Sequence, residues 1–459
     1  MAKRWVEITT LCALMTISRF AAAADLSGKW TAEVGGSQAG PQYTRVTLIV
    51  DGSKVGGMWG ELKIDGTLTD GKLSLALSDA QGASAGKLDA TLSGDTIAGS
   101  GTISGGRGGR SGGFGGGAVR PGGGAMGGGG RGGANGEGAA NFTLVRPASP
   151  PAAPRDLHFT PTNFFGTYSA QNKPVLTIFP GDVVHTWTAD AGGIDANGVH
   201  HRGGDSNIGP FYVEGALPGD TLVVHLLKVR TNRLTAHQGT RINAHAVTAA
   251  YLVGAHYDPA VTGDWTLEPD KGIAVPTHPS EHMKNYSVPL KPMLGCISVA
   301  PSGDEQFRGG DLGPYGGNMD YNDNVEGTTL LFPVFHPGAL LGMGDGHAAM
   351  GDGEVTGSAL ETSMDVDFSV EVIPGDSSGM VRAETKEYLV AFGITGSVPE
   401  SIQVATSQLA TWIKKQYQLS DSEVALLFAS TLKYDVTELV DSQYDVVAKI
   451  PKSVLANMK

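Results

Sequence analysis

The sequence is short of the residues that several classes of protein require. Its 459 residues include 33 Lys and Arg against 46 Asp and Glu, a formal net charge of −13. Nucleic acids and anionic membrane surfaces bind proteins that carry an excess of Lys and Arg, so the acidic charge balance excludes both as partners. Aromatic residues make up only 7% of the chain and hydrophobic residues 40%. These values fit a soluble protein whose length favours two or more domains.

Cysteine is nearly absent. The chain has two, Cys12 and Cys296. Cys12 lies in an N-terminal segment that we expect to be removed, so the mature chain cannot form an internal disulfide. Cys296 lies in the apolar run 294–297, which is typical of a strand. Reactive thiols need polar, electropositive surroundings, so we interpret Cys296 as a small buried apolar residue rather than as a nucleophile.

Long hydrophobic runs are also missing. Residues 1–24 combine a basic start at Lys3 and Arg4, a mostly apolar run at 8–17 and an Ala-rich cleavage site before Asp25. This layout is typical of a secretory signal peptide, with an uncleaved anchor as the alternative. No other stretch reaches the roughly 18 apolar residues that a membrane-spanning helix needs. We therefore expect a bacterial protein that is exported, periplasmic or secreted, with no membrane contact beyond export.

Residues 25–146 predict a small β domain. Runs of period two at 73–77 and 88–92 alternate with Asp-Gly turn pairs, a pattern that favours an antiparallel meander or small barrel. Residues 105–138 contain 20 Gly in 34 and cannot bury a core, so we expect a disordered loop inside this domain. Residues 141–146 then form its closing strand. A Pro-rich linker follows at 147–155.

The remainder, 156–459, predicts a mainly β domain that ends in helices. Strand-like runs occur at 175–178, 183–187, 221–226, 328–335, 366–373 and 387–394. Two capping-box patterns, Ser397 with Glu400 and Ser420 with Glu423, open helical patterns near the C-terminus. All 12 His lie at or beyond His158, so we expect metal or proton-transfer chemistry in this domain and not in the first.

The richest candidate site is the segment 344–354. Its four Gly are interleaved with Asp345, His347, Asp352 and Glu354. The first two of these and the last two are each spaced i, i+2, which puts both partners on one face of an extended chain. Carboxylates and an imidazole can ligate a divalent metal ion or move protons. The alternative is a series of Gly/Asp turns.

Three other loops share this character. They are 190–195, 200–205 and 316–320, and each combines Gly with Asp or His beside a predicted strand. Loops at strand ends are frequent positions for functional residues held on a rigid scaffold. Any one of these loops alone would be interpreted as a solvated turn.

Taken together, these segments resemble the acetamidase/formamidase family. The resemblance rests on 209–216 with 218–220, then 316–320, then 344–347 with 351–354, in that order and spacing, and it extends over about 156–459. It implies a β-sandwich fold with C-terminal helices. It also implies hydrolysis of a small linear amide, such as formamide or acetamide, to a carboxylate and ammonia.

The resemblance also implies roles for individual residues. It places Asp190, Asp320, Asp345, His347 and Glu354 around the pocket. Its metal ligands would be Asp190, Asp320 and His347 around a divalent ion, Zn²⁺ or Ca²⁺, with Glu354 as the base that deprotonates the attacking water. We assign further catalytic roles to Asp345 and Asp352. Backbone N–H groups of Gly317 or Gly346 would hold the developing oxyanion, and the full set of predicted substrate contacts is Gly192, Gly317, Asn318 and Gly346.

The chain departs from the family at two places and in its architecture. Met350 stands where the family often has Gln, and Phe164-Phe165 where some members have His-Trp. The family is usually a lone cytoplasmic domain. We therefore leave a larger amide or a lactam open as the substrate, and a non-catalytic protein that binds a small ligand or cell-envelope fragment as the alternative function. A third possibility makes the N-terminal domain the functional half, and we expect a homo-oligomer, a dimer.

Overall fold

The computed structural model describes residues 26–35, 41–93, 96–103, 140–456 and 458. These residues form two compact units that divide between Pro147 and Ala148. The predicted signal peptide (1–24) and Gly-rich loop (105–138) lie outside the described residues. Within those residues, no helix is both long enough and apolar enough to cross a membrane.

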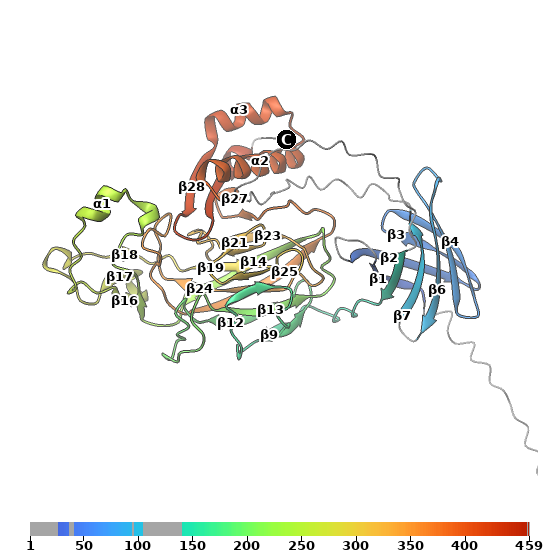
Figure 1. The fold of residues 1–459 in the computed structure, drawn as a ribbon, viewed down its shortest axis with the longest axis horizontal. Helices are drawn as coiled ribbons and strands as arrows, with labels where there is room; N and C mark the ends of the chain where they lie inside the picture. The colour runs from blue at the N-terminus through green and yellow to red at the C-terminus, as the bar shows by residue number, and fades with distance from the viewer. Residues whose placement is uncertain (1–25, 36–40, 94–95, 104–139, 457, 459) are drawn as a thin grey trace, which may run out of the picture. The chain divides into compact units, whose positions relative to one another are not determined.

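The first unit is a closed antiparallel barrel (Figure 1), which confirms the predicted small β domain. Its strands follow chain order, and pairing between β1 and β8 closes it. Alternate residues face inward, as Leu73, Leu75 and Leu77 do on β5, and Trp59 packs edge-on against Phe142 across the interior. The strands are β1 (Gly28–Val34), β2 (Gln42–Asp51), β3 (Lys54–Trp59), β4 (Leu62–Thr69), β5 (Lys72–Ser78), β6 (Ser84–Ser93), β7 (Thr96–Ile103) and β8 (Ala140–Val145).

The second unit is built on a nine-stranded and a six-stranded sheet. The nine-stranded sheet has the order β28 (Lys433–Glu438), β29 (Tyr444–Pro451), β27 (Tyr388–Thr395), β26 (Arg382–Glu384), β23 (Thr329–Pro333), β14 (Thr221–Thr231), β25 (Met364–Ile373), β12 (Val183–Thr188), β9 (Asp156–His158). The six-stranded sheet has the order β11 (Leu176–Ile178), β13 (Asn207–Val213), β24 (Leu341–His347), β19 (Met293–Ser298), β22 (Gly316–Asn318), β21 (Leu312–Gly313).

One apolar core joins these two sheets. It contains Phe368 and Leu222 from the larger sheet together with Phe211, Leu341 and Ile297 from the smaller, all fully buried. The two sheets therefore form the expected sandwich. Two small sheets complete the unit, β10 (Thr167–Ser169) with β20 (Gln306–Arg308), and β15 (Thr235–His237), β16 (Asp264–Glu268), β17 (Ile273–Pro276), β18 (Val288–Pro289).

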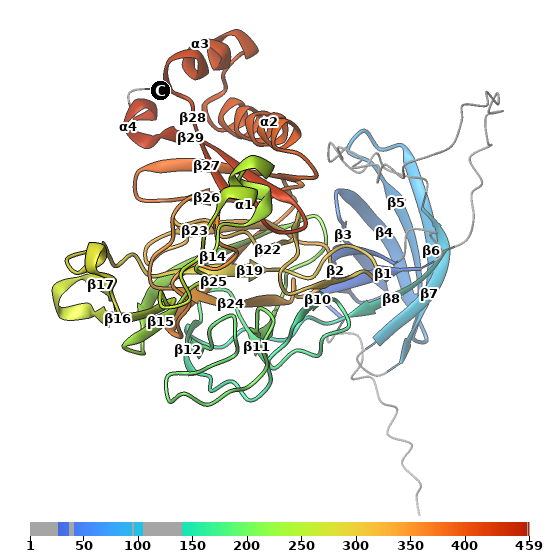
Figure 2. The ribbon, with the colours of Figure 1, turned by 60° about the vertical axis from the view of Figure 1, so that its left-hand side comes forward.

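The helices gather at the C-terminal end, as predicted. The helix α2 (Val398–Tyr417) packs on β27 and β29, with α3 (Asp421–Thr431) and the short α4 (Lys452–Leu455) beside it (Figure 2). The Ser420 and Glu423 side chains make both halves of a capping box on α3, whereas at α2 only Ser397 contributes, by accepting from the Glu400 N–H. Two helices were not predicted: α1 (Ala249–Gly254), which has six residues and buries none of them, and the four-residue α4.

Close packing of α2 on its strand generates a first prediction. A Cβ added at Gly393 in β27 would lie 2.0 Å from the Ser401 carbonyl oxygen, so Gly393→Ala must push the helix away. We expect a loss of about 1–3 kcal/mol in the free energy of unfolding, seen as a lower thermal midpoint. Gly396→Ala is the control, because nothing lies within 4 Å of its added Cβ. Equal midpoints for the two variants would contradict this packing.

Candidate active site

A buried group of ionisable side chains lies at one end of the six-stranded sheet. Strand β24 supplies Asp345 and His347, and the chain just beyond β22 supplies Asp320. These two strands flank β19, which pairs with both. The sheet order therefore brings together residues that are far apart in the sequence.

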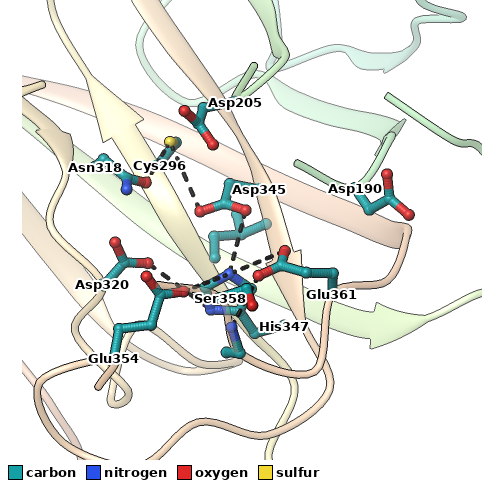
Figure 3. Close-up of polar contacts among 12 residues, drawn as sticks. Asp190, Asp205, Cys296, Asn318, Asp320, Asp345, His347, Glu354, Ser358 and Glu361 are labelled. Atoms are coloured by element: carbon teal, nitrogen blue, oxygen red, sulfur yellow. Dashed lines mark hydrogen bonds and ion pairs between the residues drawn. The ribbon is translucent and has the colours of Figure 1, made fainter. Parts of the chain in front are cut away.

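Two glutamates complete the group from the segment after β24. This segment turns back on itself, so that Glu361 forms a β-bridge with His347 and the Thr362 N–H donates to the Gly346 carbonyl. Glu354 lies in the turn region with a positive φ of 39°. Figure 3 shows both glutamate side chains pointing toward the imidazole. We refer to Asp320, Asp345, His347, Glu354 and Glu361 as the His347 group.

Carboxylate oxygens surround the imidazole. The Nε2 atom of His347 lies 3.2 Å from Asp345 Oδ1, 3.3 Å from Glu361 Oε2 and 3.7 Å from Glu354 Oε1. Its Nδ1 atom lies 3.8 Å from Asp320 Oδ1. His347 and Asp320 are fully buried, and Glu354 and Glu361 are each only 8% exposed. Four carboxylates and one imidazole thus share a space that excludes most water.

Burial and mutual repulsion set the protonation of this group. Burial, followed by the charges of neighbouring carboxylates, raises the pKa of Asp320 well above its usual range, and burial likewise raises that of Glu354. Burial and Asp345 raise the pKa of Glu361 to about 7, although His347 opposes them. Burial opposes the charge of His347, but Asp345 and Glu361 raise its pKa well above the usual value. Positive charge is therefore strongly favoured here.

The arrangement fits a divalent cation. If all five groups were ionised their net charge would be −4 + 1 = −3, which is costly to bury without a further positive charge. Both oxygens of Asp320, Nδ1 of His347 and Oε2 of Glu361 have no hydrogen-bond partner among the described residues. Ligand atoms of Asp320, Asp345 and His347 all lie within 4.8 Å of one another, and those of His347, Glu354 and Glu361 do likewise. Carboxylates and imidazole are ligands that proteins offer to Zn²⁺.

Gly295 provides the room for this group. An added Cβ at this position in β19 would lie 2.3 Å from Asp345 Oδ2 and 2.4 Å from Asp320 Oδ1. Any larger residue would therefore occupy the space into which both carboxylates project. Gly295 has no local signal in the sequence, because its neighbours form an ordinary apolar strand.

Asp190 and Asp352 lie outside the His347 group. The Asp190 side chain pairs with Arg233 at 2.6 Å and accepts the Ile194 N–H, so its charge is already balanced away from the His347 group. Asp352 is exposed and accepts a hydrogen bond from the Asn322 side chain. Neither belongs to a group that could hold an ion among the described residues. Asp345 and Glu361 take the place of Asp190 as candidate ligands.

The predicted substrate contacts also lie differently. Gly192 is exposed in the Asp190 loop. Gly317 and Gly346 are in paired strands, where an added Cβ would collide with the Asp311 carbonyl and the Met364 side chain, so close packing accounts for both glycines. The Asn318 side-chain oxygen accepts a hydrogen bond from the Cys296 thiol, and its side-chain nitrogen donates one to Asp441. The geometry therefore favours structural roles for these four residues.

Cys296 is buried, as expected, but its surroundings are polar. Its thiol donates to Asn318 Oδ1 at 2.8 Å and lies 3.9 Å from Asp345 Oδ2. Burial, followed by the charge of Asp345, raises its pKa well above the usual value. A thiol held in the protonated form can donate its hydrogen bond to Asn318, but it is a poor nucleophile.

Sequence patterns missed three residues. They are Glu361 of the His347 group, Arg233, which pairs with Asp190, and Glu438, whose carboxylate lies near those of Asp320 and Asp441. Glu361 follows Ala359 and Leu360 without the Gly-rich context that marked 344–354. The only signal was its acidic character inside an otherwise apolar and hydroxyl-rich run.

Comparisons with known proteins place this group inside a segment that is similar to a known family. The model of the Acetamidase/Formamidase family matches residues 314–407, which include Asp320, Asp345, His347, Glu354 and Glu361. The second unit also has the fold of solved acetamidases. An acetamidase from Yersinia enterocolitica is 25% identical with a TM-score of 0.57, covering 66% of this chain and 94% of that one. In its second unit the chain is thus similar to the acetamidase/formamidase family.

Two further relatives define the extent of the match. A predicted acetamidase/formamidase from Thermoanaerobacter tengcongensis is 26% identical with a TM-score of 0.57, over 67% of this chain and 99% of that one. The acetamidase of Mycolicibacterium smegmatis is 27% identical over 216 residues, 36% of this chain and 53% of that protein. The chain thus matches about half the length of this curated relative.

The Asp190–Arg233 ion pair generates a second prediction. Both side chains are mostly buried, at 7% and 13% exposure, so Arg233→Met leaves an uncompensated carboxylate. We expect a loss of about 3 kcal/mol or more in the free energy of unfolding, measured by urea denaturation. Arg230→Met is the control: Arg230 pairs with Glu326 at the surface, so its loss should leave the curve nearly unchanged. An Arg233→Met curve that overlays the wild type would show that Asp190 has another partner.

Proposed function

We propose that the protein is an amidase that hydrolyses the C–N bond of a small linear amide, giving a carboxylate and ammonia. The observation that supports this most is the His347 group, which lies within the segment that matches the Acetamidase/Formamidase family. Buried carboxylates beside an imidazole supply what hydrolysis requires, a base for water and a proton source for the leaving amine. Formamide and acetamide are the first substrates to test.

Glu354 is the residue we assign as the general base. Its carboxylate is buried, faces His347 and has a raised pKa, so it accepts a proton more readily than an exposed glutamate does. The water that it deprotonates adds to the amide carbonyl carbon. The proton then passes to the amide nitrogen, the C–N bond breaks, and ammonia leaves.

A divalent cation, Zn²⁺ or Ca²⁺, belongs to this proposal. Asp320 and His347 would hold it, with Asp345 and Glu361 as the other nearby donors. When bound, such an ion polarises a carbonyl and lowers the pKa of a coordinated water. In this chain Gly295 leaves the space for it, and Cys296 with Asn318 positions the carboxylate of Asp345.

The departures at Met350 and Phe164-Phe165 bear on substrate choice. Phe164 stacks on His201 and packs against Trp187 in an apolar patch near the Asp190 loop. Met350 follows Ala348 and Ala349 beyond the end of β24; it is half-buried and cannot supply the polar contact of a glutamine. The loss of a polar side chain at Met350 supports a comparison of larger, apolar amides with formamide and acetamide as substrates.

We also propose export and self-association. Residues 1–24 have the charge and hydropathy pattern of a signal peptide, which supports a periplasmic or secreted protein. A dimer remains the expected assembly, to be measured by light scattering.

The assignment of Glu354 generates a third prediction. Glu354→Gln keeps the size of the side chain but removes its basicity, so we expect the rate of ammonia release from acetamide to fall about 100-fold or more. Asp352→Asn, two residues earlier and exposed, should retain activity within a few-fold. Normal turnover by Glu354→Gln would remove its role as the base.

The proposed cation generates a fourth prediction. Dialysis against a chelator should abolish ammonia release across a panel of short amides, and Zn²⁺ or Ca²⁺ should restore it, because the buried carboxylates then regain their counter-charge. Metal content measured by mass spectrometry before and after dialysis controls for an ion that stays bound. Full activity in protein shown to be metal-free would exclude a required cation. Absence of turnover on every amide would favour a binding protein.

A further inference from the structure

A further carboxylate, that of Asp205, lies beside Asp345 and Cys296 (Figure 3). Asp205 is near the end of the loop 189–206, which joins β12 to β13, and it is partly exposed, whereas His347 is fully buried. Within the part of the chain that the structure describes, its side chain makes no hydrogen bond and no ion pair. No step of the proposed reaction uses this carboxylate.

The backbone fixes the position of Asp205. Its φ of 53° is positive, a conformation that Asp and Asn adopt more readily than most other residues. The Ala191 carbonyl accepts the N–H groups of Gly204 at 3.1 Å and of Asp205 at 3.2 Å. The Asp205 carbonyl accepts the side-chain amide of Asn207 at 2.7 Å. Unusual backbone conformations persist where the surrounding contacts enforce them, so this carboxylate is held in one place.

Two glycines leave room for the Asp205 side chain. An added Cβ at Gly309 would lie 2.9 Å from Asp205 Cβ, and one at Gly310 would lie 3.0 Å from Asp205 Oδ2. The Gly309 carbonyl oxygen lies 3.7 Å from the Cys296 sulfur, which is itself 3.9 Å from Asp345 Oδ2. Asp205 therefore packs against the residues that surround Asp345.

Arg233 joins the loop that carries Asp205 to the His347 group. Its guanidinium donates to Asp190 Oδ2 at 2.6 Å, at the start of this loop. The same nitrogen donates to the Glu361 carbonyl at 3.3 Å. Binding groups are most effective when their supporting contacts are rigid. This shared partner fixes the loop against the residue that bridges His347.

The Asp205 carboxylate needs a donor. Burial, followed by the charges of Asp345 and Asp441, raises its pKa to about 7. An N–H group that donates to this carboxylate would stabilise it where no basic side chain does so. An amide such as acetamide offers N–H donors on its nitrogen and one acceptor on its carbonyl oxygen. The proposed reaction uses the carbonyl and leaves the N–H groups without an acceptor.

We propose that Asp205 accepts a hydrogen bond from the amide N–H of the substrate and so selects amides over esters of the same acyl group. This inference rests on the proposed amidase function and names a residue that decides its specificity. The amide nitrogen faces Asp205 while the carbonyl faces the His347 group. A site built to receive an N–H group discriminates against an analogue that lacks it, because the acceptor is then left without a partner.

The test compares acetamide with methyl acetate, which has the same acyl group but no N–H. Ammonia release by the full chain gives the KM of acetamide, and methyl acetate added as a competitor gives its inhibition constant. Asp205→Gly removes the carboxylate and suits the positive φ. We expect the ratio of the inhibition constant to the KM to fall at least about tenfold, mainly because the KM rises. An unchanged ratio, or methyl acetate that inhibits neither protein, would overturn the role of Asp205.

Two more variants separate recognition from a structural effect. Asp205→Asn keeps the shape of the side chain and one neutral acceptor oxygen, so the ratio should fall by a smaller factor, about threefold or more. This variant decides the question if circular dichroism shows that Asp205→Gly does not fold. Asn197→Ala is the control, because it changes an exposed side chain of the same loop and should leave both constants unchanged.

The two proposals fail in different ways. Wild-type protein that releases no ammonia from any amide would reject the proposed function, and the role of Asp205 with it. Ammonia release by the wild type with the same ratio in Asp205→Gly would reject only the role of Asp205. A parallel rise in both constants leaves the ratio unchanged and would show that Asp205 acts on the structure of the site and not on the amide nitrogen.

Discussion

The cost of burying carboxylates around His347 is the constraint on which the rest of the site depends. Four acidic side chains face one imidazole in a space that admits little water. Such a group persists only if the fold over-determines its geometry and if positive charge, from protons or a cation, reduces the repulsion. The pKa values of Asp320, Glu354 and His347, all raised well above their usual range, express the same demand for positive charge.

The order of strands in the six-stranded sheet fixes the positions of these side chains. Asp320 and Asp345 belong to chain segments on either side of β19, and a single glycine at 295 lets both carboxylates approach the same space. The segment after β24 folds back in register, which fixes Glu361 opposite His347 through a backbone bridge. The site is thus set by paired strands, which hold side chains more rigidly than free loops do.

Sequence patterns predicted most of the fold and part of the site. Period-two alternation, capping pairs and turn residues are local signals, so the barrel, the C-terminal helices and the strands near 328, 366 and 387 followed from them. The Gly-rich segment 344–354 similarly indicated Asp345, His347 and Glu354. Glu361 carries no local signal, because only strand pairing brings it to the imidazole. Glu438 likewise reaches Asp320 only through the pairing of β28 with β29.

Local patterns also do not reveal which carboxylates already have a basic partner. Asp190 resembled a ligand because it lies in a Gly/Asp loop at the end of a strand, but a loop pattern does not reveal a buried partner 43 positions along the chain. Arg233 is that partner, and it neutralises the one predicted ligand that lies outside the His347 group. A carboxylate is available to a cation only where the fold has not already supplied a basic side chain.

The C-terminal hairpin, β28 with β29, contributes both to the packing of the helices and to the buried carboxylates. Its apolar helices pack on β27 and β29, as their sequence predicted, yet the strand that follows them carries Glu438 to the site. The burial of Asp320 therefore depends on a segment more than 100 residues further along the chain, which the bridge between Gly353 and Glu438 holds beside the site.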